Sequence, residues 1–175
     1  MFKNKVRTAV AGIAAGGVAI GCLGLTGVAA AQNGPLYGCT LKTINGHYLT
    51  AVGGGGRTTD VIHTDATVPR AWEKFTLVDS GDGSPIHYGI QTSNGHYLTA
   101  VGGGGRTTDV IHSDATSLLG WEKFTLVGQS NGTYAIQTSN GHYLTAVGGG
   151  GRITDTIHSD ATAVRAWEEF TVACP

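Results

Sequence analysis

The amino-acid sequence predicts an all-β fold with three equivalent units around a pseudo-threefold axis. The main observation is a 19-residue segment that begins at Asn45 and returns letter for letter from Asn94. A third copy begins at Asn140 and differs at two positions, Ile153 and Thr156, where the other copies have Thr and Val. Each copy is followed by a Trp-Glu-x-Phe-Thr ending, and the copies recur at steps of 49 and 46 residues. Self-similarity at this period predicts a repeat architecture.

The first 31 residues are predicted to form a secretory signal peptide rather than part of the folded unit. Lys3, Lys5 and Arg7 precede a long apolar segment that ends in the small residues 29–31. A basic start, an apolar stretch and a small-residue cleavage site are typical of signal peptides. A retained membrane anchor and a lipidated Cys22 are the alternatives. Cleavage after residue 31 predicts a secreted, extracellular protein without a membrane segment.

The predicted mature chain, residues 32–175, has the length of one domain. Three of the eleven Lys and Arg residues leave with the signal peptide, so eight basic residues stand against twelve acidic ones, a net charge of −4. An acidic chain without a basic stripe lacks the electrostatic footprint of a nucleic-acid-binding protein. Cys39 and Cys174 remain after cleavage, and an oxidising compartment favours a disulfide between them.

Within each repeat, four short runs of β-forming residues are separated by Gly, Asn and Asp, and helical periodicity is absent. In the second repeat we expect Asn94-Gly95 to form a tight hairpin turn, because that turn requires positive φ angles. Four strands in each of three units predict a β-trefoil, since a propeller of three blades would fall below the usual four to eight. The expected strands of the second repeat are 88–92, 96–101, 110–115 and 123–127, and the repeats span about 36–80, 86–128 and 132–175.

Alignment of the repeats predicts which side chains are buried. Strand alternation places Cys39 on the same face as the core residue Leu41. In a trefoil the first and last strands are neighbours, so Cys174 can reach Cys39. The three tryptophans of the repeat endings are expected to plug the barrel: Trp72, Trp121 and Trp167. The other predicted core residues are Ile90, Ile136, Leu49, Leu98, Leu144, Ile62, Ile111, Ile157, Phe75, Phe124 and Phe170.

The motif Asn-Gly-His-Tyr-Leu-Thr-Ala, the glycine-rich turn after it and the Trp-Glu-Lys-Phe-Thr-Leu ending together resemble the fascin-like β-trefoil repeat. The resemblance covers the whole predicted mature chain and implies a β-trefoil. Animal fascins carry several trefoils and bundle actin filaments, whereas this chain has one trefoil behind a predicted secretion signal. The Gln-x-Trp ending of ricin-type lectin trefoils is absent, so their sugar-binding residues are not carried over.

No motif in the sequence is typical of an enzyme, a metal centre or a cofactor site. The run from Gly53 to Gly56 lacks the Gly-Lys-Ser/Thr of a phosphate-binding loop, so we expect a turn. Each repeat places a histidine and an aspartate on one strand face, as in His63-Thr-Asp65, without a Gly-x-Ser-x-Gly nucleophile. The histidine after each Asn-Gly pair is expected at the surface rather than as a zinc ligand. We therefore expect a non-enzymatic protein without a metal or cofactor.

Polar residues that recur in all three repeats are the candidate ligand-binding residues. Packing of a symmetric barrel requires matching core residues, but it does not require matching polar ones. Three equivalent shallow sites suit a repetitive ligand such as a polysaccharide, because weak affinities combine. Recent duplication explains the same identity without function, and the Arg57/Asp60 spacing also fits a local ion pair. The candidates are Asn45, His47, Arg57, Asp60, His63, Asp65, Asn94, His96, Arg106, Asp109, His112, Asp114, Asn140, His142, Arg152, Asp155, His158 and Asp160.

The sequence thus predicts a monomeric, secreted binding module for cell-surface or environmental glycans. The alternative is a protein-binding trefoil, which could be a protease inhibitor, a subunit of a larger complex or an actin-binding-like relative of fascin. A protease inhibitor would use the insertion 79–85 with His87, because this loop has no counterpart in the other repeats. A subunit of a larger complex would use an apolar patch at Val68-Pro69 or at 117–119.

Overall fold

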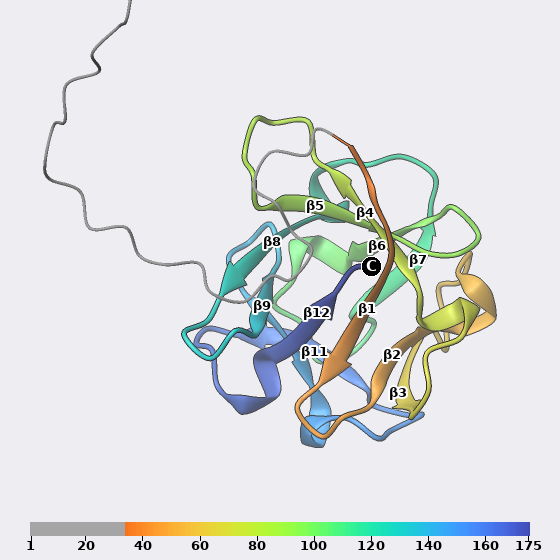
Figure 1. Ribbon diagram of the computed structural model, residues 1–175, viewed down its shortest axis with the longest axis vertical. Helices are drawn as coiled ribbons and strands as arrows, with labels where there is room; N and C mark the ends of the chain where they lie inside the picture. The colour runs from red at the N-terminus through yellow and green to blue at the C-terminus, as the bar shows by residue number, and fades with distance from the viewer. Residues whose placement is uncertain (1–33) are drawn as a thin grey trace, which may run out of the picture.

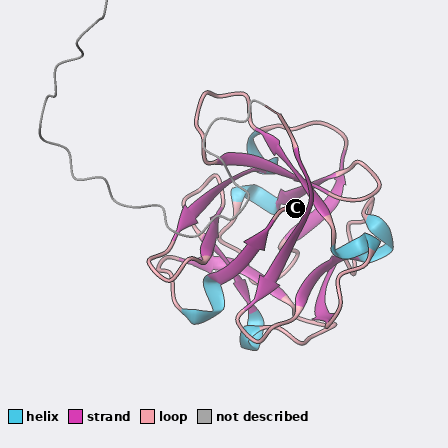
Figure 2. Cartoon of the chain, viewed as in Figure 1, coloured by secondary structure: helices cyan, strands magenta, loops and turns pink. Residues whose placement is uncertain are grey.

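The computed structural model describes residues 34–175, so the predicted signal peptide lies outside the described residues. This part of the chain forms twelve strands and six short 3₁₀ turns, which lie between the strands (Figures 1 and 2). The strands are β1 (Leu36–Thr43), β2 (Tyr48–Ala51), β3 (Ile62–Ala66), β4 (Phe75–Asp79), β5 (His87–Gln91), β6 (Tyr97–Ala100), β7 (Ile111–Ala115), β8 (Lys123–Gly128), β9 (Tyr134–Gln137), β10 (Tyr143–Ala146), β11 (Ile157–Ala161) and β12 (Glu169–Ala173). The 3₁₀ turns are η1 (Val52–Gly54), η2 (Ala71–Glu73), η3 (Val101–Gly103), η4 (Gly120–Glu122), η5 (Val147–Gly149) and η6 (Ala166–Glu168).

Six strands close into an antiparallel barrel. β1 pairs with β4 and β12, β5 pairs with β4 and β8, and β9 pairs with β8 and β12. The other six form the hairpins β2–β3, β6–β7 and β10–β11, each attached to the barrel through β1, β5 or β9. Figure 1 shows β12 beside β1, where the barrel closes. The β-trefoil prediction is confirmed, and the predicted strands of the second repeat end within one residue of the observed ones.

The barrel core is built from equivalent residues of the three repeats. Phe75, Phe124 and Phe170 are at most 1% exposed, as are Leu41 and the isoleucines that match it. Leu and Ile side chains of the hairpins extend the same cluster. Burial of each large apolar side chain contributes about 1.5–3 kcal/mol relative to exposure. The core residues predicted from strand alternation are confirmed as buried, including Cys39.

A buried glutamate anchors each 3₁₀ turn before the last strand of a repeat. Glu73 is 6% exposed, and it accepts hydrogen bonds from the Thr50 hydroxyl at 2.8 Å and from the Arg70 N–H at 2.7 Å. Glu122 and Glu168 have equivalent partners. A buried carboxylate without such donors would be costly, so these bonds fix the turn to the hairpin.

The prediction that the tryptophans plug the barrel was wrong. Trp72, Trp121 and Trp167 are 49%, 52% and 49% exposed. Each tryptophan is the middle residue of a 3₁₀ turn, and the glutamate after it is held inward by hydrogen bonds from the hairpin threonine and from the N–H of the residue before the turn. The turn therefore directs its glutamate inward and its tryptophan toward solvent.

The Asn-Gly turn of each repeat is fastened to the glycine-rich turn of a neighbouring repeat. The Asn94 Nδ2 donates to the Gly53 carbonyl at 3.0 Å, and the Asn94 N–H donates to the Gly54 carbonyl at 3.0 Å. The other two asparagines make the same pair of bonds. Gly54 has a φ of +83°, and a Cβ there would lie 2.8 Å from the Asn94 Oδ1, so other residues do not fit.

Only the glycine of the Asn-Gly turn has a positive φ, which corrects the predicted turn geometry. Gly95 has a φ of 83°, and Asn94 does not belong to the residues with positive φ. The chain reverses over Thr92–Gly95, where the Gly95 N–H donates to the Thr92 carbonyl at 2.9 Å. The asparagine is therefore required for its contact with the next repeat rather than for its backbone conformation.

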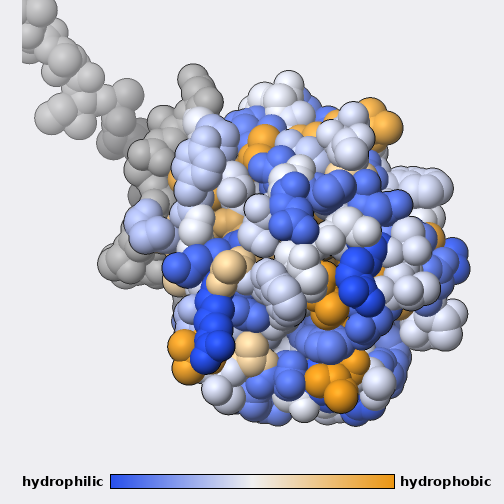
Figure 3. All heavy atoms as spheres, turned by 90° about the vertical axis from the view of Figure 1, so that its right-hand side faces the viewer, coloured by the Kyte–Doolittle hydropathy of each residue, from blue (hydrophilic) through white to orange (hydrophobic). Residues whose placement is uncertain are grey.

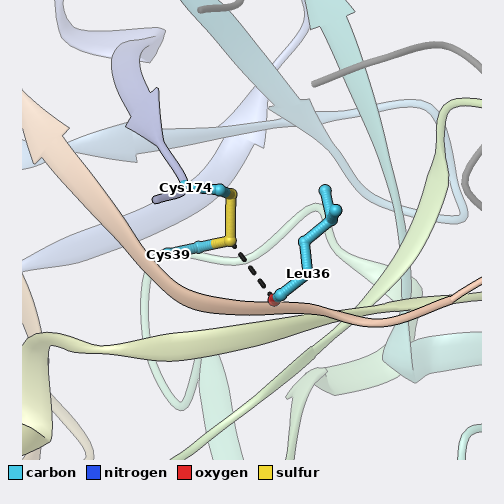
Figure 4. The surroundings of a disulfide bond; sticks show 3 residues. All are labelled: Leu36, Cys39 and Cys174. Atoms are coloured by element: carbon cyan, nitrogen blue, oxygen red, sulfur yellow. Dashed lines mark hydrogen bonds between the residues drawn. A yellow bond between two sulfur atoms is a disulfide. The ribbon is translucent and has the colours of Figure 1, made fainter. Parts of the chain in front are cut away.

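A disulfide joins the two ends of the barrel (Figure 4). Cys39 lies in β1, and Cys174 follows β12 directly, so strand pairing brings the two sulfur atoms together. The Cys39 Sγ also lies 3.3 Å from the carbonyl oxygen of Leu36. The predicted disulfide is confirmed, and it encloses nearly the whole domain, with a sequence separation of 135 residues.

We expect the double variant Cys39→Ala/Cys174→Ala to lower the free energy of unfolding by about 4 kcal/mol, because it removes a long covalent loop from the unfolded state. Guanidinium denaturation followed by circular dichroism measures this change. Reduced wild-type protein is the control and should unfold near the midpoint of the double variant. A change below about 0.5 kcal/mol, the range of neutral surface substitutions, would contradict the stabilising role.

The variant Asn94→Ala is expected to lower the free energy of unfolding by about 1 kcal/mol, because it removes one hydrogen bond between repeats. Asp114→Ala is the matched control, since Asp114 is exposed, and we expect a change within about 0.5 kcal/mol. Equal destabilisation of the two variants would refute the inter-repeat role of the asparagine. Urea denaturation of the three proteins supplies the comparison.

Candidate functional site

Arg57, Asp60 and His63 form a cluster at the start of β3, which we call the Arg–Asp–His cluster. The Arg57 Nη2 lies 3.4 Å from the Asp60 Oδ2, and the His63 Nε2 lies 2.7 Å from the Asp60 Oδ1. The Arg57 Nε also donates to the carbonyl of Thr59 at 3.2 Å. Asp60 has a φ of 51°, an uncommon conformation outside glycine that aspartate tolerates better than most residues. Both carboxylate oxygens are therefore engaged, and the cluster has a fixed geometry.

The cluster recurs with the same geometry in the other repeats. The Arg–Asp distance is 3.4 Å and the His–Asp distance is 2.7 Å in each. The aspartate side chains are 51–52% exposed and the arginine side chains 40–41%. Exposed ion pairs contribute about 0–1 kcal/mol, so stability of the fold gives little reason for three identical clusters. The members are Arg106, Asp109 and His112 in the second repeat, and Arg152, Asp155 and His158 in the third.

The structure corrects the predicted pairing of histidine and aspartate along one strand. His63 pairs with Asp60, three residues before it, rather than with Asp65, two residues after it. Asp65 and its counterparts Asp114 and Asp160 are exposed and lie outside the clusters.

The predicted asparagines of the Asn-Gly turns and the histidines that follow them lie at the contacts between repeats. The Asn45 Nδ2 donates to the carbonyl of Gly148 at 3.0 Å, so this amide is engaged within the fold. The imidazole of His47 packs on Gly151, where a Cβ would lie 3.4 Å from its Cε1. The same contacts occur at Asn94, Asn140, His96 and His142. Residues 34–175 contain no group of three His, Cys, Asp or Glu side chains that could hold a metal ion.

The exposed tryptophans are the candidate ligand contacts that the sequence analysis missed. Trp167 lines an open hollow of about 370 Å³ together with Arg165, Ala166 and Glu168. The first repeat has the same Arg-Ala-Trp-Glu order, and the second has Leu-Gly-Trp-Glu. Side-chain alternation along the sequence did not identify them, because each lies in a 3₁₀ turn before the last strand of its repeat.

Exposed apolar side chains outside the tryptophan turns are scattered over the surface. Val68 and Leu119, from the two predicted apolar patches, are 62% and 66% exposed. On the face drawn in Figure 3, hydrophobic side chains form small, separate patches among hydrophilic ones. Helices long and apolar enough to cross a bilayer are absent from residues 34–175.

The described chain is similar in fold to solved β-trefoil proteins. The designed threefold-symmetric protein ThreeFoil aligns with a TM-score of 0.65 at 14% identity, over 79% of this chain and 99% of its own. The Rhizoctonia solani agglutinin aligns with a TM-score of 0.64 at 13% identity, over 79% and 96%. The Polyporus squamosus lectin, bound to a human-type influenza-binding epitope, aligns with a TM-score of 0.59 at 16% identity, over 81% of this chain and 49% of its own.

These similarities establish the β-trefoil fold. Because the identities are low, they establish the fold alone. No protein-family model and no curated protein matches the sequence, so the fascin-like resemblance stays a prediction.

Proposed function

We propose that the protein is a secreted, non-enzymatic carbohydrate-binding module with three related surface sites, one in each repeat. The observation that carries the proposal is the exposure of one tryptophan at the same place in every repeat. A half-exposed aromatic side chain forgoes part of the stabilisation that burial gives, so fold stability does not explain three of them. Aromatic faces beside a few polar groups are typical of ligand sites.

The chemistry of the tryptophan hollow suits a sugar ring. A pyranose has apolar C–H faces, which can stack on the indole, and a rim of hydroxyl groups. In the third repeat, Arg165 lies in the same hollow as Trp167 and can donate hydrogen bonds to such hydroxyls. Arg70 holds the equivalent sequence position in the first repeat.

The Arg–Asp–His clusters supply a second set of polar groups in each repeat. Arg57 uses its Nε and Nη2 within the cluster, and a guanidinium has five N–H donors, so others remain for a ligand. A Cβ added to Gly53 in η1 would lie 3.8 Å from the Arg57 Cδ, so the arginine lies beside η1. In turn, η1 contacts η2, which carries Trp72. Cluster and tryptophan therefore project from linked turns of one repeat.

Three copies of a weak site favour a repetitive ligand. Simultaneous engagement raises the overall affinity without new contacts, because the later binding events are intramolecular. The lectins of the same fold, one of them bound to a saccharide epitope, support carbohydrate as the ligand class. The disulfide supports an extracellular location, because such bonds persist in oxidising compartments.

Replacement of the tryptophans tests the proposal. Each single variant, Trp72→Ala, Trp121→Ala or Trp167→Ala, should remove about one third of the sites that a soluble monovalent sugar occupies, and the triple variant should abolish binding on a glycan array. Tyr37→Ala is the control, because Tyr37 is an aromatic residue that is 67% exposed and belongs to β1 rather than to a 3₁₀ turn. Undiminished glycan binding by the triple variant would refute the tryptophan sites.

The arginines are tested in the same way. If the clusters contribute ligand contacts, Arg57→Ala, Arg106→Ala and Arg152→Ala should weaken binding in equal steps. Circular dichroism verifies that each variant retains the fold. A loss of binding in Trp72→Ala/Arg57→Ala that is smaller than the sum of the two single losses would place the cluster and the tryptophan in one site. Undiminished binding by all three arginine variants would refute the arginine contacts.

A protease-inhibitor function is the second candidate, and the loop between β4 and β5 favours it. The Asp82 Oδ2 lies 2.8 Å from the His87 Nδ1, and the Ser84 N–H donates to the Asp82 Oδ1 at 3.0 Å. These hydrogen bonds, that of His87 first, hold the pKa of Asp82 well below its usual range. The Tyr88 hydroxyl donates to the Pro85 carbonyl at 3.0 Å. A loop fixed before binding loses less conformational entropy when it docks.

If this loop inhibits a protease, deletion of residues 82–85 should abolish inhibition and leave the trefoil folded. Residual activity of a panel of serine and cysteine proteases measures the effect, with the tryptophan triple variant as a control that retains the loop. Absence of inhibition by the intact protein would eliminate this candidate without affecting the carbohydrate proposal.

A further inference from the structure

Three copies of one loop meet around a hollow on the pseudo-threefold axis, which we call the axial hollow. It has a volume of about 610 Å³ and is lined by residues 58–62, 107–111 and 153–157. Each loop is bonded to the next repeat: the Gly56 N–H donates to the Ser113 carbonyl at 2.6 Å, and the Ser113 N–H donates to the Arg57 carbonyl at 2.8 Å. Equivalent bonds complete a ring of three loops. The hollow is therefore preformed, as small-molecule sites usually are.

The lining of the axial hollow is amphipathic. Its inner part consists of Val61, Ile62 and their counterparts, which are buried with exposures of 6–9%. Its outer part carries exposed threonines whose hydroxyls make no hydrogen bond to any residue of 34–175: Thr58, Thr59, Thr107, Thr108 and Thr154. Hydroxyls that both donate and accept, above an aliphatic floor, match a ring with an apolar face and a hydroxylated edge.

The charges at the rim argue for a neutral ligand. Asp60, Asp109 and Asp155 line the hollow, but each shares its carboxylate with the arginine and histidine of its own cluster. Each carboxylate is thereby paired with a guanidinium, so the rim offers no uncompensated acidic site to a cation. The unpaired polar groups are the neutral threonine hydroxyls.

The two substitutions in the third repeat both fall in this hollow. Ile153 replaces a rim threonine and is 57% exposed. Thr156 replaces a valine of the floor, and its hydroxyl donates to the Ile62 carbonyl at 2.7 Å, so it belongs to the wall. A ligand on the axis contacts all three repeats at once. A ligand without threefold symmetry would therefore meet one sector, that of the third repeat, which differs from the other two.

We propose that the axial hollow binds one neutral, polyhydroxylated ring of monosaccharide size, with its apolar face toward Ile153 and the floor and its hydroxyls toward the threonines. The ligand class is that of the proposed function, on which this inference rests, but the site and its stoichiometry are separate. The protein then has one axial site in addition to three surface sites.

Titration of the isotope-labelled, disulfide-bonded protein with glucose, galactose, mannose and N-acetylglucosamine, followed by NMR, tests the inference. At least one of these sugars should shift the amide signals of all three lining segments together and saturate them at one equivalent per chain. The variant I153T should weaken this binding roughly tenfold, because it removes apolar contact from one sector. T108W should abolish it by filling the hollow.

T116W is the matched control, because Thr116 is an exposed threonine of the same repeat outside the axial hollow, and its variant should bind as the wild type does. The tryptophan triple variant should lose the surface sites and retain the axial shifts, which separates failure of this inference from failure of the proposed function. Saturation at three equivalents, wild-type affinity in T108W, or no saturable shift of these segments at millimolar sugar would overturn the proposal.

Discussion

Antiparallel pairing of β1 with β12 is the constraint on which the remaining structure depends. Thr40 to Thr43 pair with Ala173 back to Phe170, and this register converts an open row of six strands into a closed barrel. Closure encloses the three phenylalanines and removes the free edges that an open sheet would present. It also brings the three loops before β3, β7 and β11 around one axis, so the axial hollow depends on it.

Much of the fold was predictable, because the chain states the same unit three times. The strand ends agree within one residue since Gly, Asn and Asp bound each run of β-forming residues. The tryptophans were misplaced because hydrophobic character was taken as the sign of burial, whereas each tryptophan lies in a 3₁₀ turn outside the strand, where period-two alternation does not apply. The partner of His63 was not predictable in the same way. It depends on the left-handed backbone at Asp60, which the contacts of that loop with the next repeat hold in place.

Recurrence of polar residues has two physical causes in this protein, and one sequence does not separate them. Asn45 and His47 recur because they contact the glycine-rich turn of the neighbouring repeat, where their shape is required. Arg57, Asp60 and His63 recur at the surface, where packing in the core does not require these side chains. In the structure the Asn45 amide is bonded to a carbonyl oxygen of the fold, whereas the Arg57 guanidinium keeps N–H donors without a partner in its cluster. The candidate site is accordingly smaller than the set of repeated polar residues.

The identity of the inter-repeat contacts has a consequence for assembly of the molecule. The amide of Asn94 meets the glycine turn at Gly53 and Gly54, and the turns of the other repeats have the same sequence and the same bonds. These contacts therefore do not determine which repeat lies next to which. A repeat from a second molecule would make the same contacts. Chain connectivity and the covalent closure at Cys39 and Cys174 carry that information instead. A nascent chain whose cysteines are still reduced is consequently the form in which exchange of units between molecules has the fewest obstacles.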